Sequence, residues 1–287
     1  MNSPLGLRLM TRADLAFADA LRSLAAWNQT LDDWERLLAM EPQGCFVAEW
    51  NGAPAGTATT TIYGAELAWI GMVLVHPEYQ RRGIGRALLE HCVEHLRSRR
   101  VRCFKLDATP LGKKIYDRLG FKQEWTLTRW IKTDAPARPS PADRTIRSGD
   151  KVNCPALDRL DAEAFGVSRS ILLRALSLQS HCVLVRESES GRISSYGMLR
   201  TGSHALYLGP VVAARPAAGL SLLEALVARA SGQSVLWDLP DQNAPAVAWA
   251  RSQRFVPQRS LIRMYLGQNL APGNPRKQLA VAGPEIG

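Results

Sequence analysis

The chain has 287 residues, a length that favours two domains, each large enough for its own hydrophobic core. Its composition is that of an ordinary globular protein, with 46% hydrophobic and 22% charged residues. No window reaches the roughly 18 apolar residues of a membrane span, and the first residues lack the apolar core of a signal peptide. The five cysteines form no CxxC pair, so we expect a cytoplasmic protein with no membrane contact.

The formal net charge is +10, and arginine carries it, with 29 Arg against 7 Lys. Such a balance favours a polyanionic partner, which can be a nucleic acid or a small phosphorylated cofactor. The arginines are scattered through both halves, and no basic stripe interleaved with aromatic residues stands out. We therefore expect no nucleic-acid partner, although acylation of a nucleic acid stays open as an alternative.

In chain order, the first half predicts a helical region over 14–40 and then strands joined by the turn Asn51-Gly52. Further on, an apolar strand leads into a loop and an amphipathic helix that ends near Arg99. The expected strands are "CFVAEW", "GTATTTIY", "LAWIGMVLV", "VRCFKLDA" and "FKQEWTLTRWI", with a short helix near "GKKIYDRLG" before the last of them.

The segment 133–143, "TDAPARPSPAD", contains three prolines and is typical of an extended linker. We predict domains over 1–134 and 144–287, joined at 135–143. Shifting the second half back by 134 positions also reveals an internal repeat. It places "LLE" at 222–224 on "LLE" at 88–90, Gly219 on Gly85, Asp241 on Asp107, Phe255 on Phe121, Leu261 on Leu127 and Arg263 on Arg129.

The loop "QRRGIGR" at 80–86 lies where a strand turns into a helix. A helix start exposes unpaired N–H groups and the positive end of the helix dipole, so it favours an anion. Gly83 and Gly85 let the backbone approach a phosphate closely, while Arg81, Arg82 and Arg86 add positive charge. Neither the dinucleotide fingerprint GxGxxG nor the P-loop is present, but the loop is suited to a pyrophosphate.

The pattern Q/R-x-x-G-x-G after a strand resembles motif A of the GNAT superfamily of acyl-CoA-dependent N-acyltransferases. The later segment "KKIYDRLGF" is similar to the family's Y-x-x-x-GF element. Over nearly the whole chain, the sequence resembles a bacterial tandem-GNAT group whose second half is a degenerate, YitH-like domain. The segments of the second half that resemble this group are "LDAEAFGVSRSILLRAL", "YLGPVVA", "DLPDQN", "RMYLG" and "GPEIG". The resemblance implies an α/β (α+β) fold with two GNAT-like domains, each a mixed, mostly antiparallel sheet flanked by helices.

The resemblance also implies acetyl-CoA as co-substrate and a set of cofactor-binding positions. The N–H of Val73 would bind the thioester carbonyl, Val75 the pantetheine, and the loop residues Arg81, Arg82, Gly83, Ile84, Gly85 and Arg86 the diphosphate. Thr109 stands where the family often has an asparagine against the CoA chain. Tyr116 stands where many members carry the tyrosine that protonates the CoA thiolate. Packing against Phe121 is the structural alternative for Tyr116.

The general base is less well defined. Trp69 stands where some relatives carry the glutamate that acts as general base, on the strand before the loop. An indole cannot act as a base. Glu66 is the nearest carboxylate, and we name it as the candidate, with a water chain or a group from the second half as alternatives. For the acceptor amine we name Trp27, Asn28, Trp34 and Trp69, with Gln29 as a second polar contact. Trp27 and Trp34 are also spaced for one helical face in the core.

No metal is expected. "HCVEH" at 91–95 matches a zinc motif, but it lies on the helix after the loop, opposite the apolar stripe, and we interpret it as a solvated helix face. The 134-residue shift aligns Pro216 with Arg82, Ala217 with Gly83 and Ala250 with Tyr116. The second half therefore lacks an arginine and a glycine of the anion loop and the tyrosine, and we expect it to be catalytically silent. Its polar candidates are Asp238, Asn243 and Arg169.

The sequence therefore predicts a GNAT-type N-acetyltransferase. It would pass an acetyl or short acyl group from CoA directly to an amine of a small molecule or a protein. The alternative is a non-catalytic sensor or scaffold that binds acyl-CoA. The sequence indicates neither the acceptor nor the oligomeric state.

Overall fold

The computed structural model describes residues 4–133, 135, 143–149 and 154–287, so most of the expected linker lies outside the described residues. The first half contains β1 (Leu5–Leu9), the 3-10 helix η1 (Arg12–Asp14), α1 (Leu15–Leu24), α2 (Leu31–Met40), β2 (Cys45–Trp50), β3 (Ala53–Tyr63), β4 (Leu67–Val75), the 3-10 helix η2 (Pro77–Tyr79), α3 (Ile84–Ser98), β5 (Cys103–Ala108), α4 (Pro110–Arg118) and β6 (Lys122–Lys132). The second half contains β7 (Ile146–Ser148), α5 (Cys154–Phe165), α6 (Ser170–Leu178), β8 (Ser180–Glu187), β9 (Ile193–Arg200), β10 (Leu206–Ala213), α7 (Pro216–Ala228), β11 (Val235–Pro240), α8 (Ala244–Ser252), β12 (Val256–Gly267) and β13 (Gln278–Ala280).

The elements predicted for the first half are present in the predicted order, with one correction. The helical region over 14–40 is two helices, because the chain leaves α1 through Ala26 at φ +53 and starts α2 afresh at Thr30. Thr30 and Asp33 form a reciprocal capping box there, a strong helix-start signal. Trp27 therefore lies in a loop, and the expectation that Trp27 and Trp34 share one helical face is wrong.

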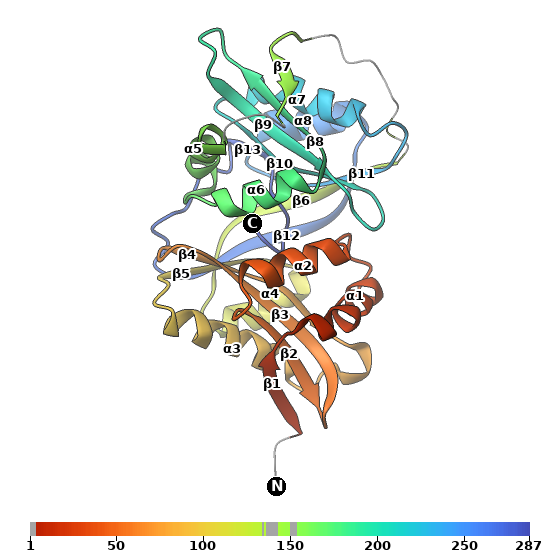
Figure 1. Cartoon of the computed structure of the whole chain (residues 1–287), viewed down its shortest axis with the longest axis vertical. Coiled ribbons are helices and arrows are strands. Elements are labelled where there is room, and N and C mark those ends of the chain that lie inside the picture. Colours follow the sequence, from red (N-terminus) through yellow and green to blue (C-terminus); the bar gives the residue numbers. More distant parts are fainter. Residues whose placement is uncertain (1–3, 134, 136–142, 150–153) are drawn as a thin grey trace.

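Over the described residues, the strands form one mixed sheet in the order β1-β2-β3-β4-β5-β12-β6-β11-β10-β9-β8-β7, with β13 added beside β10. Neighbouring strands are antiparallel except at two places, β4 with β5 and β10 with β11. The helices cover the sheet on both sides (Figure 1). The predicted mixed, mostly antiparallel sheet flanked by helices is confirmed.

The two halves exchange a strand each. β12 of the second half lies between β5 and β6 of the first, and β6 in turn pairs with β11 of the second half. Both strands cross the middle of the molecule between the lower, first half and the upper, second half (Figure 1). Neither half therefore completes its sheet from its own residues.

Two mirrored ion pairs accompany this exchange. Arg263 of β12 donates from Nε and Nη2 to the two carboxylate oxygens of Asp107 on β5, both at 2.9 Å. Arg129 of β6 donates in the same way to Asp238 on β11, at 2.7 and 2.6 Å. All four side chains are buried, and bidentate arginine–carboxylate pairs are among the strongest charged hydrogen bonds.

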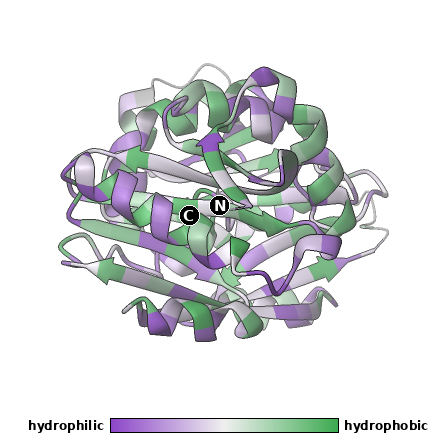
Figure 2. Ribbon diagram, turned by 90° about the horizontal axis from the view of Figure 1, so that it is seen from below, coloured by the Kyte–Doolittle hydropathy of each residue, from purple (hydrophilic) through white to green (hydrophobic). Residues whose placement is uncertain are grey.

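The hydrophobic core is also shared between the halves. One cluster joins α1, α2 and β4 of the first half to α5, α6 and β9 of the second, with Trp34, Trp69, Phe165 and Tyr196 among its members. Two further clusters lie under α3 and under α7. The helices contain both hydrophobic and hydrophilic residues (Figure 2), as expected where one face of a helix packs on a sheet.

We predict that Arg129→Met lowers the free energy of unfolding by about 3–5 kcal/mol, because it leaves the Asp238 carboxylate buried without its partner. Urea denaturation followed by tryptophan fluorescence measures this, and the exchanged strands predict a single transition for both halves. The control is Arg147→Met, which removes an exposed pair with Glu187 and is expected to cost less than about 1 kcal/mol. Two separate transitions, or equal losses in the two variants, would contradict the prediction.

Candidate active site

The candidate site begins where β4 and β5 separate. The two strands pair only at Ala68 with Phe104 and at Trp69 with Lys105, and beyond these residues they diverge. At this point β4 contains a bulge at Met72, which has φ +49 and whose carbonyl accepts a hydrogen bond from the Thr57 hydroxyl at 2.9 Å. Bulges re-aim the backbone and are common beside active sites. The strands thus form a fork that encloses a cavity of about 100 Å³.

The predicted anion loop lies where β4 ends. Arg81 and Gly83 both have left-handed backbone conformations, with φ +63 and +81, and α3 begins directly afterwards. Gly85 packs against the end of β4, since a Cβ there would lie 3.4 Å from Val75 Cγ2. Successive N–H groups in such alternating conformations form a concave anion site at a helix start.

The arginines of this loop are exposed. Arg82 stacks over the rings of Trp50 and Tyr79, at 5.1 and 5.7 Å, while Arg86 pairs with Glu90 at 2.8 Å. The structure therefore brings residues 81–86 together as one positively charged helix entrance beside the fork.

Tyr116 lies on α4, and Thr109 directly precedes that helix, across the fork from Val73; all three residues line the cavity. The Thr109 hydroxyl caps α4 by accepting the Gly112 N–H at 3.1 Å. Burial raises the pKa of Tyr116 to about 12, so its phenol stays protonated at neutral pH and can donate a proton. Its ring also lies 5.9 Å from that of Phe121, so the packing role is present as well.

The cavity contains a carboxylate that the sequence analysis did not single out. Glu285, from the segment after β13, is 4% exposed and lines the cavity together with Val73 and Tyr116. Gln29 Nε2 donates to its Oε2 at 2.7 Å. Burial, reinforced by the nearby Asp33 carboxylate, raises the pKa of Glu285, while Arg200 opposes that shift. The available signal was an ionisable residue inside the apolar tail "LAVAGPEIG", because unpaired carboxylates are rarely buried without a role.

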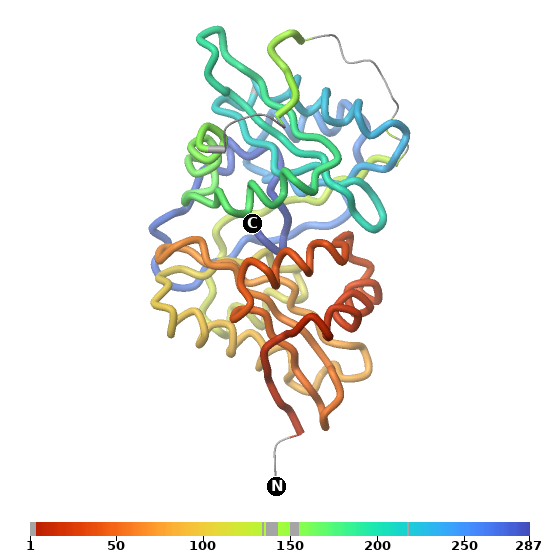
Figure 3. Tube along the Cα trace, viewed as in Figure 1, coloured from red at the N-terminus to blue at the C-terminus, as the bar shows by residue number. Residues whose placement is uncertain are grey.

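Residues 281–287 hold Glu285 at the centre of the molecule, where the chain end appears between the two halves (Figure 3). Tyr63 Oη donates to the carbonyl of Ile286 at 2.8 Å, and Trp69 Nε1 donates to that of Pro284 at 2.9 Å. Gly71 of β4 lies directly under the tail, since a Cβ there would meet the Glu285 carbonyl oxygen at 2.4 Å. The first half therefore positions a carboxylate that belongs to the second.

A second carboxylate in the cavity, Asp107, is already engaged. Both of its oxygens accept from Arg263, whose guanidinium is itself held between the rings of Trp69 and Trp125 at 4.5 and 4.1 Å. A carboxylate in a bidentate pair has little basicity to offer. Glu285 accepts one hydrogen bond from a neutral amide, so it is the better placed of the two to take a proton.

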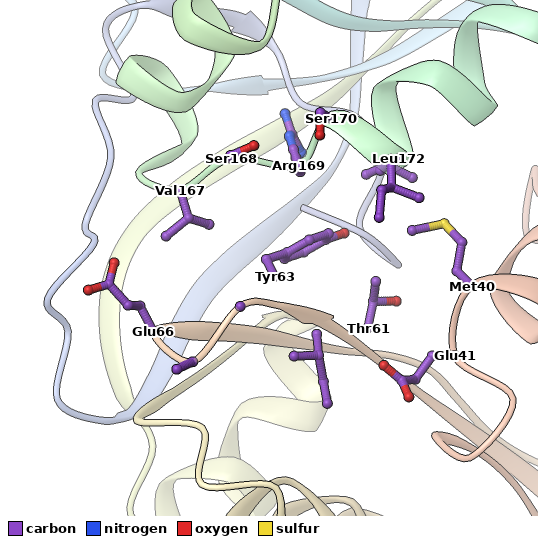
Figure 4. Close-up of a pocket in the computed structure, with 14 residues that line it drawn as sticks. Met40, Glu41, Thr61, Tyr63, Glu66, Val167, Ser168, Arg169, Ser170 and Leu172 are labelled. Atoms are coloured by element: carbon purple, nitrogen blue, oxygen red, sulfur yellow. The ribbon is translucent and has the colours of Figure 1, made fainter. Parts of the chain in front are cut away.

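Glu66, the base candidate from the sequence, lies on the turn before β4 and pairs with Arg102 at 3.0 Å. It lines a different and larger cavity of about 470 Å³, formed by this turn and residues 167–172 of the second half. Figure 4 shows Glu66 at one end of that cavity, with Tyr63 and Arg169 further in. Glu66 does not line the cavity that holds Tyr116.

The predicted acceptor residues lie in three different places. Trp27 lines the fork cavity from the loop between α1 and α2, and so does Gln29. Asn28 instead joins the halves: its Oδ1 accepts from the N–H groups of His204 and Ala205, and its Nδ2 donates to the Ala205 carbonyl. Trp34 and Trp69 are fully buried in the shared core.

The second half has the same fork between β10 and β11, which pair only at Leu206 with Val235 and Tyr207 with Leu236. In this half a segment of the chain itself occupies the fork. β13 pairs with β10, and the next residue, Val281, donates its N–H to the carbonyl of Asp238 on β11. Asn243, at the start of α8, donates to the carbonyls of Arg276 and Gln278 and holds this strand.

The remaining second-half candidates have structural partners. Asp238 pairs with Arg129, and Arg169 pairs with Asp161 and donates to the carbonyl of Gly287. Ala250 takes the place of Tyr116, since α4 and α8 are offset by the predicted 134 positions. Between β5 and β11 the corresponding positions are offset by 131, so Asp238 corresponds to Asp107, and the expectation that Asp241 does so is wrong.

His91 and His95 pack edge-on against the ring of Phe46, at 4.6 and 5.3 Å. Over the part of the chain that the structure describes, no group of three or more His, Cys, Asp or Glu side chains could hold a metal ion. Within the same residues, no helix is long and apolar enough to cross a membrane.

Comparison with known proteins decides the family. The profile described as "Acetyltransferase (GNAT) family" matches residues 14–121, and the one described as "Acetyltransferase (GNAT) domain" matches residues 157–279. The chain belongs to the GNAT superfamily, as a tandem protein. It is an acyltransferase, and GNAT proteins transfer an acyl group from CoA to an amine.

Three relatives illustrate the range of similarity. The uncharacterized N-acetyltransferase YitH of Bacillus subtilis is 26% identical over 178 residues, which are 62% of each chain. The holothin acyltransferase of a Pseudoalteromonas species is 24% identical over 91% of this chain and 87% of its own. The crystal structure of a putative acetyltransferase from Pyrococcus horikoshii superposes with a TM-score of 0.85 at 22% identity, covering 100% of this chain and 97% of the other. The two proteins therefore share one fold over the whole length of this chain.

We predict that Gly71→Ala lowers the free energy of unfolding by about 1–3 kcal/mol, because the added methyl group overlaps the backbone of Glu285. Thermal denaturation measures the effect. Gly6→Ala, in β1, is the matched control, since a Cβ there meets nothing within 4 Å. Equal stability of the two variants would show that the tail does not rest on Gly71 in solution.

Proposed function

We propose that the first half transfers an acetyl or other short acyl group from CoA to an amine by direct attack in a ternary complex. The observation that carries this proposal is a single cavity, beside a positively charged helix entrance, that is lined by Val73, Tyr116 and Glu285. These residues supply a main-chain donor, a protonated phenol and a carboxylate, the three groups that the reaction needs.

In this proposal the helix entrance at 81–86 binds the CoA diphosphate and the pantetheine enters the fork along β4, past Val75. The free edge of β4 beyond Trp69 is suited to such an extended arm, which would hydrogen-bond to the backbone as a strand does. Thr109, whose oxygen already caps α4, has its hydroxyl proton left to donate to the arm. The thioester then lies beside Val73, where the bulge at Met72 re-aims the main chain.

The reaction follows from these positions. Glu285 removes a proton from the acceptor ammonium, and the freed lone pair attacks the thioester carbonyl carbon. The Val73 N–H stabilises the developing oxyanion, a contribution typically of about 10²–10³ in rate. The carbon–sulfur bond then breaks, and the Tyr116 phenol gives its proton to the departing thiolate. The attacking nitrogen loses its second proton as the amide forms, and this proton restores the Tyr116 phenol through solvent, which leaves the proton on Glu285 to be released to bulk water. The raised pKa of Glu285 suits this role, because a base poised closer to neutral pH takes a proton more readily.

We propose that the second half is catalytically silent and serves the first. Three features support this: β13 fills its fork, Pro216 removes an N–H from the start of α7, and Ala250 replaces the tyrosine. The acceptor would be the amine of a small molecule or of a protein. The name of the holothin acyltransferase relative favours a small molecule.

Acetyl-CoA is expected to bind with a stoichiometry of one per chain, which isothermal titration calorimetry measures. Gly83→Val should weaken this binding at least about tenfold, because a β-branched residue is strained at φ +81 and the anion loop must rearrange. Gly64→Val has a similar φ of +78 on an exposed turn away from the fork and serves as the control. Two bound molecules per chain would contradict the silent second half, and none would contradict the proposed function.

Glu285→Gln should lower kcat by about 10²–10⁴, the range of a general base, in a thiol-release assay with a panel of amines. In the native enzyme kcat/KM should fall as pH decreases through the raised pKa of Glu285, at a pH above the ordinary glutamate range, and the variant should lack this fall. Because folding raises that pKa, ionisation of Glu285 costs folding free energy as pH rises. Glu285→Gln should therefore be at least as heat-stable as the native protein at pH 8.

Two further variants complete this test. Tyr116→Phe should lower kcat without moving the acidic limb of the pH profile, because it removes the acid and leaves the base. Glu66→Gln discriminates between the two base candidates. A lost acidic limb in Glu66→Gln, with the limb intact in Glu285→Gln, would assign the base to Glu66.

A further inference from the structure

The fork cavity contains an arginine that the proposed reaction does not use. Arg259, on β12, lines the cavity, and its Nε is buried without a hydrogen-bond partner. Among the described residues, its guanidinium makes no hydrogen bond or ion pair, whereas the neighbouring Arg129 is neutralised by Asp238. The side chain is half-buried, and Asp238, already paired with Arg129, is the charge that most favours its ionised form. A half-buried guanidinium with no hydrogen-bond partner in the protein is available for a bound anion.

The same cavity holds an unused acceptor. Gln29 donates a hydrogen bond from Nε2 to Glu285, and the Oε1 of Gln29 is buried and accepts no hydrogen bond. Glu285 and Gln29 together therefore offer oxygens to an ammonium group, while Arg259 offers N–H groups to an anion. Both atoms belong to residues that line this one cavity, so a single ligand with an acidic and a basic group could satisfy both.

Building on the proposed function, we infer that the acceptor is a small amino carboxylate, whose ammonium group lies against Glu285 and Gln29 and whose carboxylate is bound by Arg259. The planar guanidinium matches a carboxylate in two parallel hydrogen bonds. Attack of the amine then yields an N-acyl amino acid and free CoA.

This site gives Arg259 a role in specificity. A neutral amine of the same shape leaves the half-buried arginine without a hydrogen-bond partner, which is how a polar site rejects an analogue that lacks the matching group. Residues of both halves are needed, since Gln29 comes from the first and Arg259 and Glu285 from the second. The tandem arrangement would thus select the acceptor as well as supply the base.

The test compares matched acceptors. Thiol release from acetyl-CoA is measured with the 20 α-amino acids, β-alanine and γ-aminobutyrate, and with the carboxamide of each. For the best acceptor, kcat/KM of the native enzyme is expected to be about 10²-fold higher for the acid than for its amide. Arg259→Gln should bring this ratio to within about threefold, mainly through KM, while Arg259→Lys keeps part of it.

The control is Arg251→Gln, which removes an exposed arginine of α8 and should leave the ratio unchanged. Amides that react as well as acids in the native enzyme, or an acid preference that survives Arg259→Gln, would overturn the inference while leaving the proposed function intact. A preference for phosphoethanolamine over every carboxylate would overturn it too. Absence of turnover with every amine, despite bound acetyl-CoA, would instead contradict the proposed function, and this inference with it.

Discussion

The exchange of β6 and β12 between the halves is the constraint on which the rest of the structure depends. A sheet that takes a strand from each half cannot be divided at the linker, because both remaining pieces would expose unpaired strand edges. The mirrored pairs Arg263–Asp107 and Arg129–Asp238 fix the register at the two crossings. Together these features place the tail that follows β12 across the centre of the molecule, and with it the carboxylate of Glu285.

The two forks show how one architecture can lead to opposite outcomes. Each is made by a parallel pair of strands that separates after two residues. In the second half a peptide strand, β13, satisfies the free edge of β10, and Asn243 holds it. In the first half the edge stays open beside a helix entrance with two left-handed backbone positions. A cofactor arm and a β-strand are interchangeable partners for such an edge, because both offer hydrogen-bonding groups along an extended chain.

Features that depend only on neighbouring residues in the chain could be predicted from the sequence. The loop at 80–86, the apolar face of α3 and the order of elements in the first half follow from spacing, glycine and charge, and all are present. The strand exchange could not be predicted, since β6 and β12 have the same alternating pattern whichever neighbour they pair with. The location of Glu285 depends on contacts with Gln29 and Gly71, more than 200 positions away in the chain, so the apolar tail could single out this carboxylate but could not place it in the cavity. The error over Trp27 was of another kind, because the capping box at Thr30 and Asp33 was readable in the sequence.

Because β12 and Glu285 come late in the chain, the strand exchange also sets the order in which the site is assembled during translation. Every group proposed to hold the cofactor precedes residue 120, yet the carboxylate and the strand that completes the leading sheet are translated more than 130 residues later. A nascent first half therefore has an unfinished sheet edge and lacks the carboxylate that we propose as the base. On the proposed mechanism, catalytic competence would appear only after residue 285 has emerged and β12 has closed the leading sheet.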